Sequence, residues 1–254
     1  MRRFALVGRH LPHTFSPKFF TQKFHTEKII DALYETVELK DIAQIIPFVQ
    51  KTENLKGFNV TIPYKEEILP YLDALYGTAA DISVVNTVKV SVDTTGNTII
   101  KGYKLEGYNT DAIGFSAEIR PLLKPGMDRA LLLGDGASAK TVEFVLNQIG
   151  IECLKVSRKG TIGTIGWNEL NDYVIKHHKL IVNTTPIGQF PTLTNQPIIP
   201  WEAVAESHLF FDLIYNPEQT EFLKTASSKG ARIQNGMGML RLQAEKSWEI
   251  WNKK

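Results

Sequence analysis

The chain has 254 residues, of which 43% are hydrophobic and 22% are charged, and its formal net charge is +2. That length allows one large or two modest domains, and the small charge gives no reason to expect nucleic-acid binding. A single cysteine, Cys153, excludes an internal disulfide, and no apolar run approaches the roughly 20 residues that span a bilayer. We therefore expect a cytoplasmic protein that binds no membrane.

The first half of the chain alternates strand-like and helix-like patterns. Apolar residues before Gly8 predict a buried strand, and Ser16-Pro17 predicts an N-cap followed by a helix. This alternation is typical of an α/β domain with a largely parallel sheet. Two later β-rich segments, joined by a turn at residues 93–97, predict a hairpin. The predicted strands cover residues 4–7, 34–39, 58–62, 83–92 and 98–103, and the predicted helices cover residues 16–25, 42–51 and 110–123.

A polar cluster is expected where the strand at residues 58–62 ends. Asn59 and Thr61 alternate with apolar residues, so they share one face of that strand. Pro63 cannot donate to a strand ladder, so the strand stops there and Lys65 opens the next helix. Ligands of open α/β sheets bind beyond the carboxyl ends of the strands, so these polar groups indicate a site. The alternative is a solvated strand end followed by a surface lysine.

The second half of the chain contains a glycine turn. An apolar strand at residues 130–133 is followed directly by Gly134-Asp135-Gly136-Ala137-Ser138-Ala139 and then by a helix to about residue 149. In that context, glycines let backbone N–H groups approach a pyrophosphate at the helix N-terminus. The turn predicts a dinucleotide site, and the alternative is a tight turn without a ligand. The other predicted strands are 152–156, 180–182, 210–214 and 232–233, and the other helices are 167–176, 220–229 and 239–251.

Ser157, Arg158 and Lys159 end the second strand of this half, where NAD-binding proteins usually carry a carboxylate for the ribose 2′-hydroxyl. Two cations favour a 2′-phosphate instead, which the Arg158 guanidinium can contact through two N–H groups. The predicted cofactor is therefore NADP(H), and the alternative is an exposed charged turn. Thr184 belongs to a polar turn after the third strand, beside the expected cofactor cleft.

Several segments, in order over nearly the whole chain, resemble the shikimate dehydrogenase family. The most specific are the segment from Asn59 to Lys65 and the segment at residues 107–114, which contains Asp111. The chain departs from the family pattern in the glycine turn, where Asp135-Gly136-Ala137 replaces an alanine followed by two glycines. Other departures are Ser157 in place of asparagine, no arginine after Lys159, and Thr14 in place of serine. The remaining matching segments are residues 8–17, 85–87, 183–188, 212–217 and 235–240, the last together with Gln243.

The resemblance implies an α/β fold with an N-terminal α/β substrate-binding domain, a Rossmann-type NADP-binding domain and a cleft between them. It places the substrate domain at residues 1–109, with a terminal helix at 237–254 packing back on it, and the cofactor domain at residues 110–236. The implied activity is the reversible, NADP-dependent reduction of 3-dehydroshikimate to shikimate in aromatic amino acid (chorismate) biosynthesis. The implied partner is this small-molecule substrate, with no nucleic acid. The implied oligomeric state is a monomer or a homodimer.

The resemblance also assigns Lys65 and Asp111 as a catalytic pair. A lysine is an acid at neutral pH, so Lys65 can protonate the alkoxide formed when a ketone is reduced, while Asp111 orients it. In the oxidation direction Lys65 must be neutral, so oxidation is expected to be faster at higher pH. The substrate-contacting positions are Thr14, Ser16, Asn59, Thr61, Asn86, Asp111, Tyr215 and Gln243. The cofactor-contacting positions are Gly134, Asp135, Gly136, Ala137, Ser138, Ser157, Arg158, Lys159, Thr184, Ile214, Gly236 and Met239.

Two other functions fit parts of the sequence. One is a quinate/shikimate dehydrogenase that uses NAD or both cofactors. The other is a non-catalytic, nucleotide-sensing homologue, against which the intact Lys65 and Asp111 argue because a sensor needs no acid–base pair. The histidines show no spacing typical of a closed metal site, and hydride transfer needs no metal, so we expect none.

Overall fold

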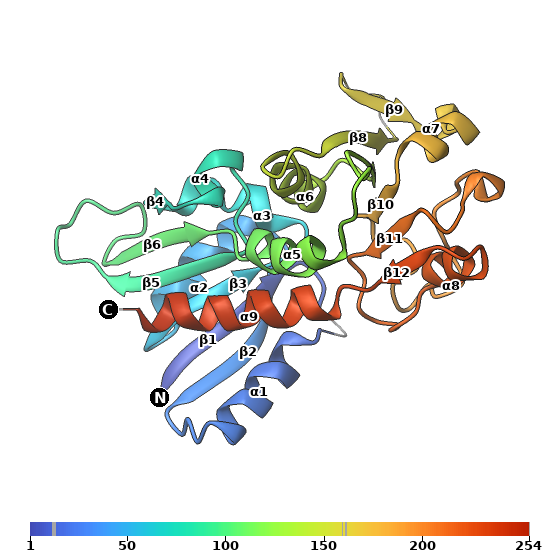
Figure 1. Ribbon diagram of the computed structural model, residues 1–254. Coiled ribbons are helices and arrows are strands. Elements are labelled where there is room, and N and C mark those ends of the chain that lie inside the picture. Colours follow the sequence, from blue (N-terminus) through green and yellow to red (C-terminus); the bar gives the residue numbers. More distant parts are fainter. Residues whose placement is uncertain (12–13, 159, 161, 254) are drawn as a thin grey trace. The chain divides into compact units, whose positions relative to one another are not determined.

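The computed structural model describes residues 1–11, 14–158, 160 and 162–253. The chain divides into two compact units (Figure 1): unit 1 contains residues 1–110 and 243–254, and unit 2 contains residues 111–242. Each unit is built on one six-stranded sheet with helices, which confirms the predicted α/β class. The assignment of substrate binding and cofactor binding to separate domains stays a prediction.

Unit 1 has a mixed sheet with the strand order β2-β1-β3-β5-β6-β4. Strands β1, β2 and β3 are parallel, whereas β5 runs antiparallel to both β3 and β6. The carboxyl ends of β1 and β3 therefore meet at one edge, where Val7 lies beside Val60. The strands are β1 (Arg2–Gly8), β2 (Ala32–Glu38), β3 (Leu55–Val60), β4 (Ala74–Leu75), β5 (Thr87–Val92) and β6 (Tyr103–Tyr108).

The helices of unit 1 are short, and one of them starts one residue earlier than its predicted N-cap implies. The N-cap of α1 is Phe15, so the prediction of Ser16 as the N-cap was wrong. Ser16 is instead the buried first residue of the helix, and its hydroxyl contacts Tyr34. The helices are α1 (Ser16–Thr26), α2 (Ile45–Lys51), α3 (Tyr64–Glu67) and α4 (Thr78–Ile82), with 3₁₀ turns at Ile42–Gln44 and Leu69–Tyr71.

The predicted hairpin is present as β5 and β6, but its second strand begins at Tyr103 instead of residue 98. The reason is the carboxylate of Asp93, which accepts hydrogen bonds from the backbone N–H groups of Thr95 and Gly96 and from the hydroxyl of Thr98. An aspartate that bonds the backbone just ahead of it folds the chain into a local loop. Strand pairing therefore resumes only after that loop.

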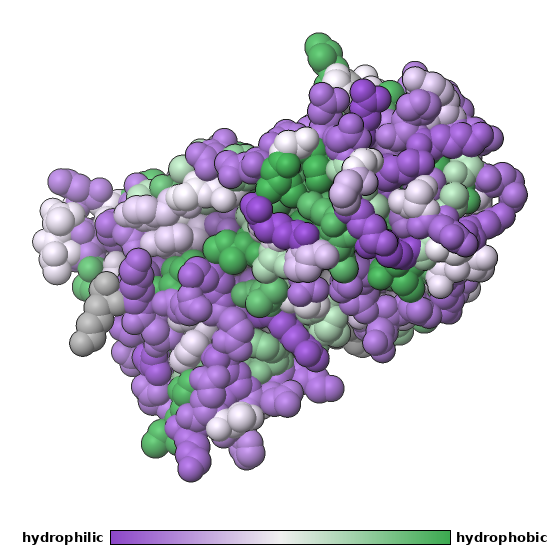
Figure 2. All heavy atoms as spheres, viewed as in Figure 1, coloured by the Kyte–Doolittle hydropathy of each residue, from purple (hydrophilic) through white to green (hydrophobic). Residues whose placement is uncertain are grey.

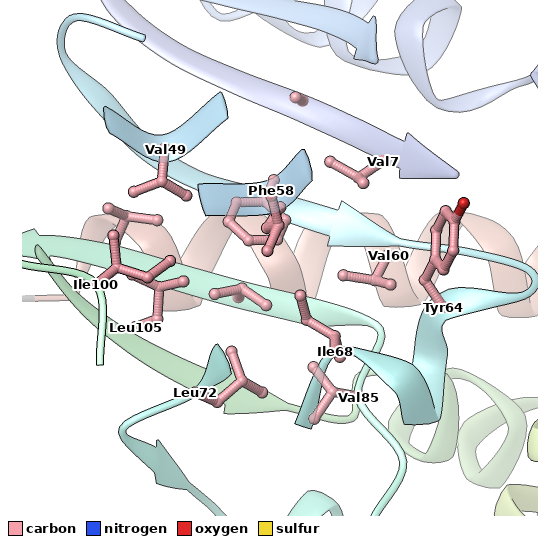
Figure 3. Packing of buried hydrophobic residues seen from close by; sticks show 14 of the residues in the cluster. Val7, Val49, Phe58, Val60, Tyr64, Ile68, Leu72, Val85, Ile100 and Leu105 are labelled. Carbon is pink, nitrogen blue, oxygen red and sulfur yellow. The ribbon is translucent and has the colours of Figure 1, made fainter. Parts of the chain in front are cut away.

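One of the two buried clusters among the described residues of unit 1 packs against one face of the parallel strands. Figure 3 shows Phe58 and Val60 of β3 packed with Val7 of β1 and Val49 of α2. The side chain of Tyr64 belongs to the same buried cluster. Because Tyr64 is the first residue of α3, this packing fixes the turn that carries Lys65 at the end of β3.

The last helix, α9 (Met237–Asn252), begins in unit 2 and ends in unit 1. In unit 1, the Trp251 ring stacks on Phe4 with centroids 4.9 Å apart, and its Nε1–H donates to the Val88 carbonyl at 2.9 Å. A Cβ at Gly57 would lie 2.2 Å from the Trp251 ring, so only glycine allows this close approach. The aromatic contacts hold this half of α9 beside the sheet (Figure 1).

Unit 2 has the strand order β12-β11-β10-β7-β8-β9, and every neighbouring pair is parallel. The order reverses between β7 and β10, since the chain moves outward through β8 and β9 and then returns to the other side. This is the strand order of the Rossmann dinucleotide-binding fold. The strands are β7 (Arg129–Leu133), β8 (Glu152–Ser157), β9 (Thr164–Gly166), β10 (Leu180–Asn183), β11 (Leu209–Asp212) and β12 (Arg232–Gln234).

The helices of unit 2 cover its sheet, and the predicted ones are present with shifted ends. The predicted helix at residues 167–176 begins as a 3₁₀ turn, Trp167–Glu169, and becomes helical only from Asp172. Strand β9 was not predicted, because three residues are too few to show an alternating pattern. The helices are α5 (Asp111–Ile119), α6 (Ala137–Asn147), α7 (Asp172–His177) and α8 (Glu221–Ser228), with 3₁₀ turns at Arg120–Leu122 and Trp201–Ala203.

Hydrophilic residues predominate on the face shown in Figure 2. Within the described part of the chain, no helix is long and apolar enough to cross a membrane, and no three His, Cys, Asp or Glu side chains gather as a metal-binding group. Burial raises the pKa of the Cys153 thiol to about 12, so its thiolate scarcely forms at neutral pH. Cys153 instead packs against a buried hydrophobic cluster of unit 2.

Candidate active site

Thr61 lies at the edge where β1 and β3 end. Its backbone N–H donates to the Val7 carbonyl at 2.9 Å, and a Cβ on Gly8 would lie 2.7 Å from Thr61 Cγ2. Glycine at position 8 is therefore required by the close approach of the two strand ends. The Thr61 side chain is half-buried, which leaves part of it open to a ligand.

Lys65 lies in the short helix α3, just beyond this edge. The preceding Tyr64 is fully buried and its hydroxyl donates to the Leu39 carbonyl. The backbone N–H of Val85 donates to the Lys65 carbonyl at 2.8 Å, which ties α3 to the segment that leads into Asn86. The Lys65 side chain is half-buried. The backbone segments that carry two predicted site residues, Lys65 and Asn86, are thus joined to each other by a hydrogen bond.

A buried hydrogen-bond network joins two predicted substrate contacts, Asn86 and Gln243. Asn86 Nδ2 donates to Thr110 Oγ1 at 3.0 Å and to Gln243 Oε1 at 3.4 Å. Asn86 Oδ1 accepts the backbone N–H of Thr110 at 2.7 Å. These residues are far apart in sequence, and they meet because α9 packs on unit 1.

Asn59 belongs to the same network and is only 4% exposed. Its Oδ1 accepts from the Tyr34 hydroxyl at 2.8 Å, and its Nδ2 donates to Thr87 Oγ1 at 3.0 Å and to Ser247 Oγ at 2.9 Å. These contacts use the amide inside unit 1, so they favour a role in positioning the neighbouring groups. A direct contact between Asn59 and the substrate stays a prediction.

Ser16 reaches this network through Tyr34. Burial raises the pKa of the Tyr34 phenol well above its ordinary value, while the contact with the Ser16 hydroxyl opposes that rise. Tyr34 therefore stays a neutral donor to Asn59. Thr14, the other residue predicted to bind the substrate carboxylate, is half-buried.

The sequence did not indicate four members of this network, and all four carry a hydroxyl group. One signal was available for Ser247: it lies four residues after Gln243, on the same face of a helix. Ser247 and Thr87 are fully buried, and their hydroxyl oxygens are 2.8 Å apart. The four residues are Tyr34, Thr87, Thr110 and Ser247.

In unit 2, the ends of β7 and β10 touch at the point where the strand order reverses. Gly134 has a φ of +123°, and a Cβ there would lie 2.6 Å from Thr184 Oγ1. The Thr184 hydroxyl donates to the Leu133 carbonyl at 2.8 Å. Only glycine fits at position 134, because both the backbone angle and the space exclude a side chain.

Gly136 is different, because no contact among the described residues requires glycine there. Its φ is −82°, and a Cβ at this position would meet nothing within 4 Å. Gly136 is the N-cap of α6, and a glycine has no side chain with which to cap that helix end. A ligand that approaches the backbone explains the glycine, and uncapped N–H groups suit a phosphate. The turn, with Ala137 and the half-buried Ser138, therefore fits a dinucleotide pyrophosphate.

Asp135 and Ser157 are in direct contact across the first two strands of unit 2. The Ser157 hydroxyl donates to Asp135 Oδ2 at 2.6 Å. Ser157 is only 1% exposed, whereas Asp135 and Arg158 are exposed. The predicted cofactor residue Lys159 lies outside the described residues.

A buried carboxylate, Asp212, links the turns after β10 and β11. Its oxygens accept from Asn183 Nδ2 at 3.0 Å, from the Thr220 hydroxyl at 2.6 Å and from the Ile214 backbone N–H at 3.1 Å. Burial raises the pKa of Asp212 to about 6 despite these bonds, which each favour the charged form. The cluster holds Ile214, which is 5% exposed, and the half-buried Tyr215 at the end of β11.

Contacts within the protein explain why glycine stands at position 236 and methionine at position 239. A Cβ at Gly236 would lie 2.1 Å from the Leu213 carbonyl oxygen, so glycine is required there by close backbone contact. Met239 packs in a buried cluster with Phe115 and Phe211. The predicted contacts of Ile214, Gly236 and Met239 with the cofactor stay predictions.

Asp111 is the buried first residue of α5, where a carboxylate is favoured by the helix dipole. It belongs to unit 2, whereas Lys65 belongs to unit 1. Their role as a catalytic pair stays a prediction.

Comparisons with known proteins agree with this geometry. Residues 6–88 match the family model described as "Shikimate dehydrogenase substrate binding domain". A protein from Caldicellulosiruptor bescii named "Shikimate dehydrogenase (NADP(+))" is 35% identical, over 99% of this chain and 89% of that protein. The solved shikimate dehydrogenase of Aquifex aeolicus has a TM-score of 0.84 at 29% identity, covering 99% of this chain and 92% of that chain.

A second solved structure, from Thermus thermophilus, is shikimate 5-dehydrogenase in complex with NADP(H) and shikimate. Its TM-score is 0.82 at 27% identity, and the match covers 99% of this chain and 94% of that chain. These matches run through both units. The chain belongs to the shikimate dehydrogenase family.

Replacing each glycine of the turn by alanine should affect a different property of the protein. Gly136→Ala should leave the melting temperature unchanged, because a Cβ there meets nothing, but should weaken NADP+ binding by at least about 10-fold. Gly134→Ala should destabilise the protein by about 2–4 kcal/mol, since it strains the backbone and collides with Thr184. Thermal unfolding and calorimetric titration measure both. Unchanged NADP+ affinity in Gly136→Ala would contradict this interpretation of the turn.

The raised pKa of Asp212 predicts a pH-dependent stability. Because the folded value, about 6, exceeds the ordinary value of 3.8, the folded state binds the proton more tightly. This stability is fully present below pH 4 and is lost as the pH rises through about 6. The free energy of unfolding of the wild type, minus that of Asp212→Asn, should fall by about 2–3 kcal/mol between pH 4 and pH 7. Urea titrations at each pH test this, and a constant difference would contradict it.

Proposed function

We propose that this chain catalyses the reversible, NADP-dependent reduction of 3-dehydroshikimate to shikimate in aromatic amino acid (chorismate) biosynthesis. The observation that carries the proposal is the match along both units to relatives named shikimate dehydrogenase (NADP(+)), at 35% identity in the Caldicellulosiruptor protein. The Thermus relative binds NADP(H) and shikimate, and its fold covers nearly all of this chain. The candidate site offers the chemical groups that such a reaction needs.

The polar groups of unit 1 suit a small acid with several hydroxyls. Asn86 and Gln243 meet in one buried network, and each has amide groups that can bond ring hydroxyls. Ser16 and the half-buried Thr14 and Thr61 add hydroxyl groups, of which the first two are proposed to bind the carboxylate. A site built from such groups discriminates strongly, because a missing substrate hydroxyl leaves a buried group unpaired.

The catalytic roles proposed for Lys65 and Asp111 follow from charge. NADPH, when bound, supplies the hydride for ketone reduction. Lys65 carries the proton that the developing alkoxide oxygen needs, and its ammonium stabilises the negative charge on that oxygen. Asp111 accepts hydrogen bonds from the ammonium and from the reacting hydroxyl, which orients both. In the oxidation direction, Lys65 accepts the hydroxyl proton.

The residues of unit 2 suit NADP(H). Gly136 leaves the backbone open to a pyrophosphate, and Thr184 packs against Gly134 in the same turn. Arg158 is exposed at the end of β8, where its guanidinium can contact the 2′-phosphate. We further propose that the protein works in the cytoplasm as a monomer or homodimer, as predicted from the sequence.

A direct assay tests the proposal. Purified protein mixed with shikimate and NADP+ should show increasing absorbance from NADPH, and the initial rate should be higher at pH 9 than at pH 7 because Lys65 must be neutral to accept a proton. Quinate with NAD+ serves as the comparison for the quinate-oxidising alternative. No NADPH formation with shikimate at either pH would refute the proposal. NADH formation from quinate and NAD+ would then favour the quinate-oxidising alternative, and no activity with either pair would favour the nucleotide-sensing alternative.

Replacing Lys65 separates catalysis from binding. Lys65→Ala should lower kcat by at least about 100-fold, since it removes the proton carrier, while the calorimetric Kd for shikimate should change little. Lys51→Ala, which removes an exposed lysine at the end of α2 in the same unit, should retain wild-type turnover. Near-normal turnover in Lys65→Ala would show that another group carries the proton.

A further inference from the structure

The carboxylate of Asp135 is held at the carboxyl end of β8. Asp135 belongs to the glycine turn after β7, yet its Oδ2 accepts a 2.6 Å hydrogen bond from Ser157, the last residue of β8. Ser157 is only 1% exposed, so a rigid part of the sheet fixes the position of this carboxylate. Asp135 itself is exposed, so a ligand can reach it.

This position matters because of the sheet topology. Strand β8 is the parallel neighbour of β7 on one side of the point where the strand order reverses. In Rossmann folds, the end of this second strand meets the adenosine ribose, and NAD-binding proteins place a carboxylate there to accept from the 2′-hydroxyl. In this chain the strand ends in Ser157 and Arg158, and the glycine turn supplies the carboxylate instead.

A cation, Arg158, and an anion, Asp135, therefore both lie where the adenosine ribose of a cofactor is expected. Arg158 follows Ser157 directly and favours a 2′-phosphate. The carboxylate of Asp135 disfavours that phosphate, because like charges repel, but can accept from a free 2′-hydroxyl. One hydrogen bond from Ser157 leaves further lone pairs on the carboxylate for such a contact.

We propose that Asp135, held by Ser157, is a specificity-determining residue that narrows the preference for NADP(H) over NAD(H). It accepts from the ribose 2′-hydroxyl of NAD(H) and opposes the 2′-phosphate of NADP(H). The chain therefore binds both cofactors. This inference rests on the proposed function, because it concerns the cofactor of that reaction.

A purely structural role for Asp135 makes different predictions. If the contact with Ser157 only held the glycine turn against β8, removing the carboxylate would loosen the turn and weaken the binding of both cofactors by the same factor. A role in specificity changes the two affinities in opposite directions. The ratio of the two dissociation constants therefore separates the alternatives, and it needs no measurement of activity.

The experiment is calorimetric titration of the full-length protein with NADP+ and with NAD+, without substrate. Asp135→Ala should bind NADP+ about 10-fold more tightly and NAD+ several-fold more weakly than the wild type. Asp135→Asn, which removes the charge but keeps the size, should also tighten NADP+ binding. Glu152→Ala removes an exposed carboxylate at the opposite end of β8, so it should leave the ratio within about twofold.

The outcomes distinguish this inference from the proposed function. An unchanged ratio in Asp135→Ala, or equal weakening of both cofactors, would overturn the role of Asp135 while the proposed reaction stands. A wild type that binds neither cofactor would overturn both. A shift of the ratio in Glu152→Ala as large as in Asp135→Ala would show an effect of net charge alone, which also overturns the inference.

Discussion

The hydrogen bonds of Ser247 are the constraint on which the rest of unit 1 depends. Its hydroxyl lies within 2.9 Å of both Asn59 Nδ2 and Thr87 Oγ1, and it joins α9 to the middle of the sheet. Buried polar groups are costly unless paired, so this network fixes one register of the helix on the strands. That register brings Gln243 to Asn86, which lies 157 residues earlier in the chain, and the aromatic contacts of Trp251 maintain it one turn further on. The positions of the proposed substrate contacts are therefore fixed by a hydrogen-bond network whose other members are buried side chains not proposed to touch the substrate.

Unit 2 uses a similar arrangement at the point where its strand order reverses. The contact between Gly134 and Thr184 joins the turns after β7 and β10, and Asp212 joins the turns after β10 and β11 through Asn183. These contacts explain why some of the conspicuous polar residues and glycines are present without any ligand. Gly136 remains unexplained by packing, and for that reason it is the strongest indication within this unit of a bound phosphate.

Much of the fold could be predicted from the sequence, because alternating patterns and glycine turns are local. The βαβ segment around Gly134 and the strand before Pro63 are examples. The hairpin strand was displaced because the side chain of Asp93 competes with strand pairing, and Ser16 did not cap its helix because it faces Tyr34. The hydroxyl network was missed because no pattern marks Tyr34, Thr87, Thr110 and Ser247 as site residues, although Ser247 shares a helix face with Gln243. Their roles arise from long-range contacts, as does the bond between Asp135 and Ser157.

The central claim is that Lys65 and Asp111 act together on one hydroxyl of a substrate held by Asn86 and Gln243. The most direct test is a crystal structure of the protein with NADP+ and shikimate bound. The account predicts that Lys65 Nζ and a carboxylate oxygen of Asp111 each lie within about 3.2 Å of the reacting hydroxyl oxygen. A well-ordered complex in which either group lies beyond hydrogen-bond reach, with another side chain in its place, would contradict the account.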